Sequence, residues 1–123
     1  MTPADILGAW ALVSCTRFTD GAQADHPLGQ KPSGLILYTP DGFMSALILK
    51  DSSLGPGLTA YGGRWEVENG VVHHHVLYNT EAGRAGTTLI RHPRMEGRLL
   101  ILQTEKRQSA RGLSWMDFAW TRP

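Results

Sequence analysis

Four features are scarce in this sequence: cysteine, long apolar runs, charge of one sign and helical periodicity. Cys15 is the only cysteine, which excludes an intramolecular disulfide and favours a reducing compartment. Its apolar surroundings favour an inert buried thiol over a nucleophile. No apolar run approaches the roughly 18 residues of a membrane span, and no basic segment precedes an apolar one near Met1. We therefore expect a cytoplasmic protein with no membrane partner.

The charges are balanced and scattered along the chain. Lys and Arg number 12 and Asp and Glu number 11, for a formal net charge of +1. Nucleic-acid binding needs a basic stripe, so we expect no nucleic-acid partner. Glycine-rich phosphate loops, nucleophile elbows and Cys-x-x-Cys motifs are also absent from the sequence. We expect no cofactor.

The length and composition indicate one folded domain over residues 1–123. Hydrophobic residues make up 41% of the chain and charged residues 19%, which is ordinary for a globular protein. Thr2 followed by Pro3 predicts one short helical turn before Gly8. Strand-like runs bounded by turn residues then recur every roughly ten to fifteen residues. The predicted strands are Ala9–Thr19, Gly34–Thr39, Gly42–Lys50, Thr59–Glu68, Val71–Asn79, Thr87–His92, Arg98–Glu105 and Leu113–Thr121.

The connections between these runs predict antiparallel neighbours. Thr39–Gly42, Asn69–Gly70 and Glu96–Gly97 are short turns with residues that accept a positive φ. Parallel pairing would need crossovers of about a dozen residues or more, which are missing. Eight such strands with one apolar face are expected to close into a barrel, because closure covers that face and removes exposed edges. A barrel of eight strands has room for one small ligand.

Strand alternation predicts which side chains face the interior, because successive residues point to opposite sides. In the run 59–68, Tyr61, Gly63, Trp65 and Val67 share one face. In the run 71–79, Val72, His74 and Val76 do the same. The predicted interior also contains Ile36, Tyr38, Met44, Ala46, Ile48, Phe118 and Trp120.

Several segments carry a more specific signal: Gly8–Ser14, Gly34–Ala46, Ala60–Val67, Val72–Val76 and Trp120–Arg122. They resemble the bacterial and fungal lipocalin-like domain family, and the run Tyr-Thr-Pro-Asp-Gly-Phe-Met-Ser is the most specific part. His74 and Arg91 stand at positions that match the family. The resemblance implies an all-β, calycin-type barrel with a central cavity. It also implies that Trp10 packs beneath Arg122 at the barrel floor. It implies no single function, because related barrels carry, isomerise or cyclise ligands.

Three residues are candidates for chemistry in the cavity. An inward His74 among valines would be a neutral imidazole that can move a proton, or a core histidine satisfied by a hydrogen bond. Arg91 would anchor a ligand carboxylate, enolate or carbonyl, or be an ordinary exposed arginine. The Tyr38 phenol can orient a carbonyl or simply pack in the core. The expected ligand-binding residues are Tyr61, Trp65, Met44, Ile36, Phe118 and Trp120.

The run His73–His75 invites a metal interpretation, which alternation argues against. His74 points to the opposite side from its neighbours, so the three imidazoles cannot share one ion. Only His73 and His75 share a face, and the sequence shows no strong partner for them. We expect no metal. Heme held through a histidine, as in some small lipocalin-like barrels, is a minor alternative implied by the resemblance.

Two functional hypotheses of different classes follow. The first is a cofactor-independent isomerase, cyclase or dehydratase of secondary metabolism, acting on a small hydrophobic, polyketide-like or terpenoid-like metabolite. His74, Arg91 and Tyr38 would be its catalytic residues. The alternative is a non-catalytic carrier or sensor of a small hydrophobic ligand. The sequence leaves a homodimer open in either case.

Overall fold

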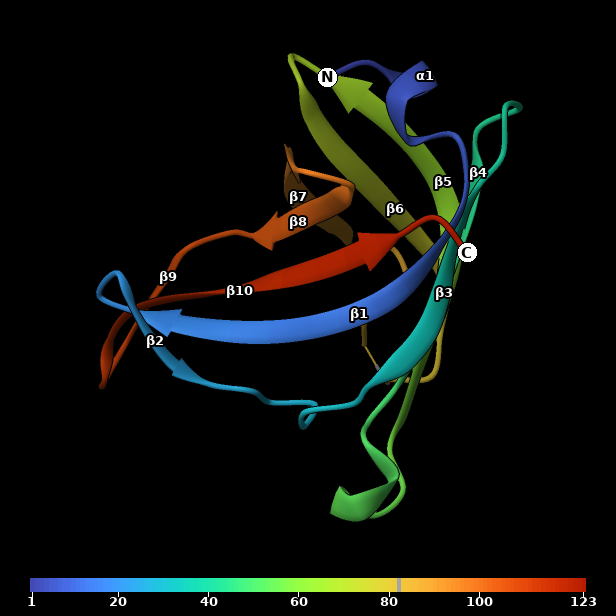
Figure 1. The fold of residues 1–123 in the computed structure, drawn as a ribbon. Coiled ribbons are helices and arrows are strands. Elements are labelled where there is room, and N and C mark those ends of the chain that lie inside the picture. Colours follow the sequence, from blue (N-terminus) through green and yellow to red (C-terminus); the bar gives the residue numbers. More distant parts are fainter. Residues whose placement is uncertain (82) are drawn as a thin grey trace.

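The chain forms a closed antiparallel β-barrel with a short helix at one end (Figure 1). The computed structural model describes residues 1–81 and 83–123. Its elements are α1 (Pro3–Ile6), β1 (Gly8–Thr19), β2 (Ala22–Asp25), β3 (Ser33–Tyr38), β4 (Phe43–Leu49), the 3-10 helix η1 (Ser52–Leu54), β5 (Leu58–Glu68), β6 (Val71–Asn79), β7 (Thr88–Glu96), β8 (Leu99–Thr104), β9 (Arg107–Ser109) and β10 (Gly112–Thr121). Among the described residues, no helix combines the length and apolarity that crossing a bilayer requires.

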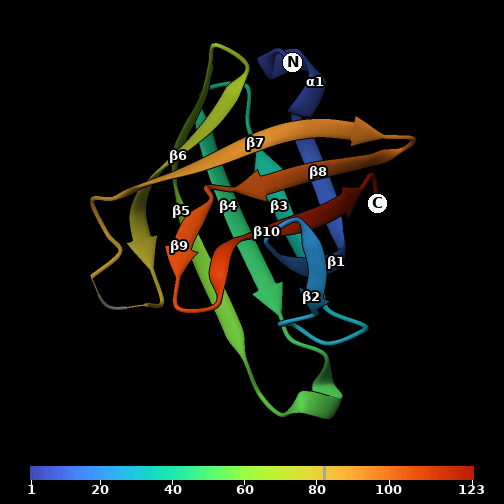
Figure 2. The ribbon, with the colours of Figure 1, turned by 90° about the vertical axis from the view of Figure 1, so that its left-hand side faces the viewer.

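Eight strands close the barrel in the order β1-β3-β4-β5-β6-β7-β8-β10, with β10 pairing back onto β1. All of these pairs are antiparallel, and the closing pair places Cys15 opposite Phe118. In Figure 1 the blue β1 and the red β10 run side by side, and in Figure 2 the orange β7 and β8 do so across the front of the barrel. The predicted fold class, an eight-stranded antiparallel barrel with a short N-terminal helical turn, is confirmed.

Two short strands lie where the sequence predicted loops. β2 pairs with the last residues of β1, and β9 pairs with the first residues of β10. These two segments pair with each other in the β1–β10 ladder but extend past the residues that pair with β3 and β8. The backbone groups on their other edges need partners, which β2 and β9 supply. β7 also continues past the predicted end at His92. Pro93 lies beyond the last β6–β7 pair, so β6 has no residue there that would accept a hydrogen bond from the N–H that proline lacks.

The core follows the predicted alternation. Tyr61 and Trp65 on β5 and Val72, His74 and Val76 on β6 are buried, each at most 8% exposed. The inner faces of β3, β4 and β10 contribute Ile36, Tyr38, Met44, Ala46 and Trp120 to the same buried core. Ile48, Val67 and Phe118 pack against it and are partly buried.

Gly63 lets β5 and β6 approach closely. A Cβ at this position would overlap the backbone carbonyl of His75 on the paired strand. The ladder between the two strands shifts register between Gly62 and Gly63, which marks a bulge. The glycine is therefore required by the strand packing that brings His74 into the core.

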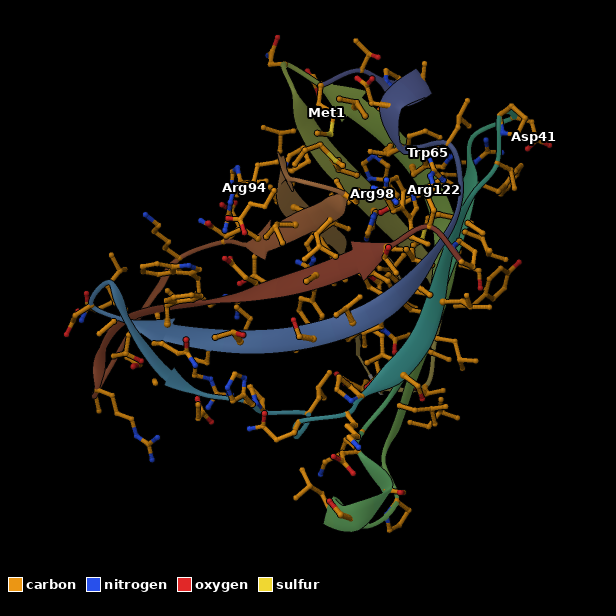
Figure 3. All side chains as sticks on the ribbon, viewed as in Figure 1. Met1, Asp41, Trp65, Arg94, Arg98 and Arg122 are labelled. Atoms are coloured by element: carbon orange, nitrogen blue, oxygen red, sulfur yellow. The ribbon has the colours of Figure 1, made fainter. Side chains whose placement is uncertain are left out.

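One end of the barrel is closed by α1 and by contacts between the first and last strands. Ile6 is fully buried in the core, and the Trp10 indole N–H donates to its carbonyl at 2.9 Å. The Arg122 guanidinium lies 3.7 Å from the Trp10 ring centroid and donates to the Leu7 carbonyl at 2.8 Å. Figure 3 places Arg122 just past the end of β10, beside the start of β1. The predicted Trp10–Arg122 pair is confirmed.

Cys15 on β1 is an inert core residue. Its side chain is 1% exposed, and burial raises the pKa of the thiol to about 12. A thiol that stays protonated at neutral pH is a poor nucleophile. The structure agrees with the expectation of a buried, unreactive cysteine.

Candidate functional site

His74 lies at the centre of a buried hydrogen-bonded triad. The Tyr38 hydroxyl on β3 is 2.7 Å from His74 Nε2, and the Tyr61 hydroxyl on β5 is 3.0 Å from His74 Nδ1. A neutral imidazole donates from one nitrogen and accepts at the other. One tyrosine therefore donates to the ring and the other accepts from it, and both nitrogens are satisfied.

The triad is held in its uncharged form. Burial, and after it the positive charge of Arg91, lower the pKa of His74 to about 3. Burial also raises the pKa of the Tyr38 and Tyr61 hydroxyls above the usual value near 10. At neutral pH the three rings are a chain of hydrogen bonds without a formal charge, as expected for an inward His74.

The space beside the triad is almost filled. An inner cavity of about 10 Å³ lies between β3, β4, β5, β6 and β10. A cavity of this volume is at the lower limit for holding one water molecule. The residues that line it are Ile36, Ile48, Tyr61, His74, Arg91, Leu102, Phe118 and Trp120.

Two of the expected ligand-binding residues pack away from this cavity. Trp65 tilts against the Tyr38 ring at a centroid distance of 4.8 Å and donates its indole N–H to the Thr39 carbonyl. Met44 is buried in the core and lines neither this cavity nor the larger one described next. Their observed contacts are those of core packing.

A much larger cavity of about 580 Å³ opens at the ends of β1, β7, β8 and β10. Its wall has an apolar part formed by Leu89, Ile90, Trp115 and Met116. The charged residues that line it are Arg17, Arg84, Arg91, Arg107, Arg111 and Glu105. Five guanidinium groups thus face one carboxylate, although the whole chain is nearly neutral. We call this space the mouth cavity.

Three of these arginines have no counter-charge among the residues that the structure describes. Arg17 is 3.2 Å from Asp25, and Arg84 is 3.1 Å from Glu81. Glu105, the only carboxylate in the lining, is 2.9 Å from His92. The remaining arginines form no ion pair within residues 1–81 and 83–123; they are Arg91, Arg107 and Arg111.

Arg91 connects the two cavities, because it belongs to the lining of both. It is partly buried on β7, and its guanidinium donates to the carbonyl of Ile90 at 3.0 Å. The sequence placed Arg91 inside the barrel near His74 and Tyr38, and the structure brings all three together. The sequence analysis did not identify the other arginines of the mouth. Arg17 lies near the end of β1, and Arg84, Arg107 and Arg111 lie outside the strands that the sequence predicted.

The alternation of the histidine run is also observed. His74 is fully buried, whereas His73 and His75 lie on the outer face of β6, with ring centroids 5.9 Å apart. The sequence showed no partner for these two, but the structure places Glu66 of β5 beside them. Heme does not fit at His74, because both ring nitrogens are hydrogen-bonded and the adjacent cavity is too small.

The closed eight-stranded antiparallel barrel, with one end covered by a short helix and a cavity at the other, has the architecture of lipocalin-like barrels. The family model described as Lipocalin-like domain matches residues 7–54, from the start of β1 through η1. No curated protein matches the sequence. The fold of the whole chain and the match over its first strands agree, and such barrels are suited to binding small molecules.

Proposed function

We propose that this barrel binds a small amphipathic molecule in the mouth cavity, with its anionic or carbonyl-bearing end directed toward Arg91. The observation that carries the proposal is a cavity of about 580 Å³ lined by three arginines that form no ion pair within the described part of the chain. Ligand sites in proteins typically measure about 300 to 1,000 Å³ and combine an apolar wall with a few placed polar groups. The mouth cavity has this size and an apolar part of its wall, but its lining is richer in charged and polar groups than that of a typical ligand site.

The charge of the lining supports an anionic group on the ligand. A guanidinium stays charged when buried, so a partly buried arginine gains stability from a carboxylate or several acceptors. Arg91 has one backbone acceptor, the Ile90 carbonyl. A ligand carboxylate could take two hydrogen bonds from it, while Trp115 and Met116 contact the apolar body.

The test uses 1-anilinonaphthalene-8-sulfonate, an apolar fluorophore with one anionic group. We expect saturable binding that weakens about tenfold in Arg91→Gln, which corresponds to one charge-assisted hydrogen bond. Arg98→Gln is the matched control, because Arg98 is exposed in the β7–β8 turn and lines neither cavity. Equal affinity in both variants and the original protein would contradict a ligand anchored by Arg91.

A second candidate is the cofactor-independent isomerase or cyclase of a hydrophobic metabolite, and one observation favours it. The chain Tyr38–His74–Tyr61 links two hydroxyls through a neutral imidazole that can accept a proton at one nitrogen while releasing one from the other. Arg91 lies next to this relay and could stabilise developing negative charge on an oxygen. Trp120 supports the same site, since its buried indole N–H has no acceptor among the described residues.

Native mass spectrometry of protein purified from its own host would identify the bound molecule and the subunit count together. If the barrel is an enzyme, His74→Gln should slow conversion of that molecule about 100-fold or more while folded protein is retained. Unchanged conversion in His74→Gln would remove the relay from the mechanism. Recovery of the ligand chemically unaltered after incubation would favour the carrier.

A further inference from the structure

Three potential metal ligands that line neither cavity meet on the outer face of the β5–β6 hairpin. Glu66 of β5 is directly opposite His73 of β6, and His75 follows two residues later on the same face. The ligand atoms of all three side chains lie within 4.8 Å of one another. We propose that Glu66, His73 and His75 bind one divalent transition-metal ion of the zinc class.

The donor set suits such an ion. Two imidazoles and one carboxylate are typical ligands of zinc and its neighbours, and a fourth position filled by water completes a tetrahedron. Around zinc, with bonds of about 2.1 Å, tetrahedral ligand atoms lie roughly 3.4 Å apart. His75 Nε2 and Glu66 Oε1 are already 3.0 Å apart. Rotation about the side-chain bonds of the exposed Glu66 and the half-buried His73 can bring the other ligand atoms to this separation.

A neighbouring strand orients one of the imidazoles. Thr88 of β7 is opposite His75, and its hydroxyl lies 2.9 Å from His75 Nδ1. This contact leaves Nε2 directed at Glu66 and available to a metal. Hydrogen bonds to the second ring nitrogen are the usual way in which proteins fix a metal-binding histidine. His73 has no hydrogen-bond partner among the described residues, so its ring can turn without losing a contact.

A positive charge on this face belongs to Arg64, which is opposite His75 in the ladder. Its guanidinium lies 4.6 Å from the centroid of the Phe43 ring on β4, on the side away from the histidines. The site therefore has one carboxylate to offset the charge of a cation. Without a metal, the same atoms form the His75–Glu66 pair, whose side chains are 41% and 55% exposed.

The chain provides a matched control for the interpretation that this is only a surface ion pair. His92 and Glu105 form an equivalent pair at 2.9 Å, with side chains 44% and 53% exposed. Among the described residues they have no third ligand, since the only such cluster is Glu66 with His73 and His75. A metal ion that binds any histidine–carboxylate pair would bind both at His75–Glu66 and at His92–Glu105.

The experiment titrates the protein, free of any histidine tag, with ZnCl2 by isothermal calorimetry and with CoCl2 by visible absorption. We expect one ion per chain, with a cobalt spectrum of four- or five-coordination. His73→Ala and Glu66→Gln should each weaken zinc affinity at least tenfold, whereas His92→Ala should bind like the original protein. Circular dichroism checks that each variant is folded.

Two outcomes would overturn the proposal. One is the lack of a saturable zinc site at concentrations up to 1 mM, on the order of the weakest specific metal sites in proteins. The other is affinity that is unchanged in His73→Ala or reduced equally in His92→Ala. The result is independent of ligand binding in the mouth cavity, because that cavity contains none of the three proposed ligands.

Discussion

Acid should destabilise the barrel through His74, and the size of the effect can be derived from the structure. Burial lowers the pKa of His74 to about 3 in the folded protein, whereas an unfolded chain has an imidazole near 6.5. Between these values the unfolded chain binds a proton that the folded one does not. Stability therefore falls as the pH drops below 6.5. At pH 5 the loss is about 2 kcal/mol, set by the 1.5 units below the unfolded pKa.

The assay is urea unfolding followed by tryptophan fluorescence at pH 7.5 and pH 5.0. Between pH 7.5 and pH 5.0 the free energy of unfolding of the original protein should fall by about 2 kcal/mol more than that of His74→Gln, because the variant lacks the titrating ring. Carboxylates and the other histidines titrate in both proteins, so their contributions cancel in the comparison. His92→Gln, which removes a partly exposed histidine, should not reproduce the effect. An equal loss in the original protein and His74→Gln would refute a neutral His74 in the folded barrel.

Three further predictions concern stability at neutral pH, measured by the same unfolding assay. Tyr38→Phe leaves a nitrogen of the buried His74 ring without its partner and should cost about 1 to 3 kcal/mol. Arg122→Leu removes the cation–π contact with Trp10 and the hydrogen bonds to backbone carbonyls, and a loss of about 1 to 2 kcal/mol is expected. Gly63→Ala places a methyl group against a backbone carbonyl of β6, so we expect a loss above about 3 kcal/mol or no soluble protein. A Gly63→Ala protein as stable as the original would show that the strands can separate at the bulge.

The closed part of the barrel was predictable because short turns and alternation act over a few residues. Asn69 and Gly70 predict a hairpin, and the inward position of His74 follows from the valines two residues away on either side. Alternation was less informative in β3, where Leu35 and Leu37 are each 42% exposed although Ile36 between them is buried. β2 and β9 were missed because their fully exposed residues carry no apolar pattern.

The site was less predictable because its contacts join distant segments. Tyr38 reaches His74 across 36 residues, a pairing that exists only after the strands curve into a cylinder. Glu66, by contrast, could have been found. A two-residue turn at Asn69 and Gly70 pairs Glu68 with Val71, and counting back along both strands places Glu66 opposite His73.

The ladder between β1 and β10 also determines when the barrel can form during synthesis. One edge of β1 stays unpaired until β10 has been synthesised, so a nascent chain that lacks β10 cannot close the barrel. Until then its hydrogen-bonding groups are exposed to pairing with other chains, a hazard typical of folds with distant contacts. Translation speed and chaperone access before β10 has been synthesised should therefore affect the yield of native protein.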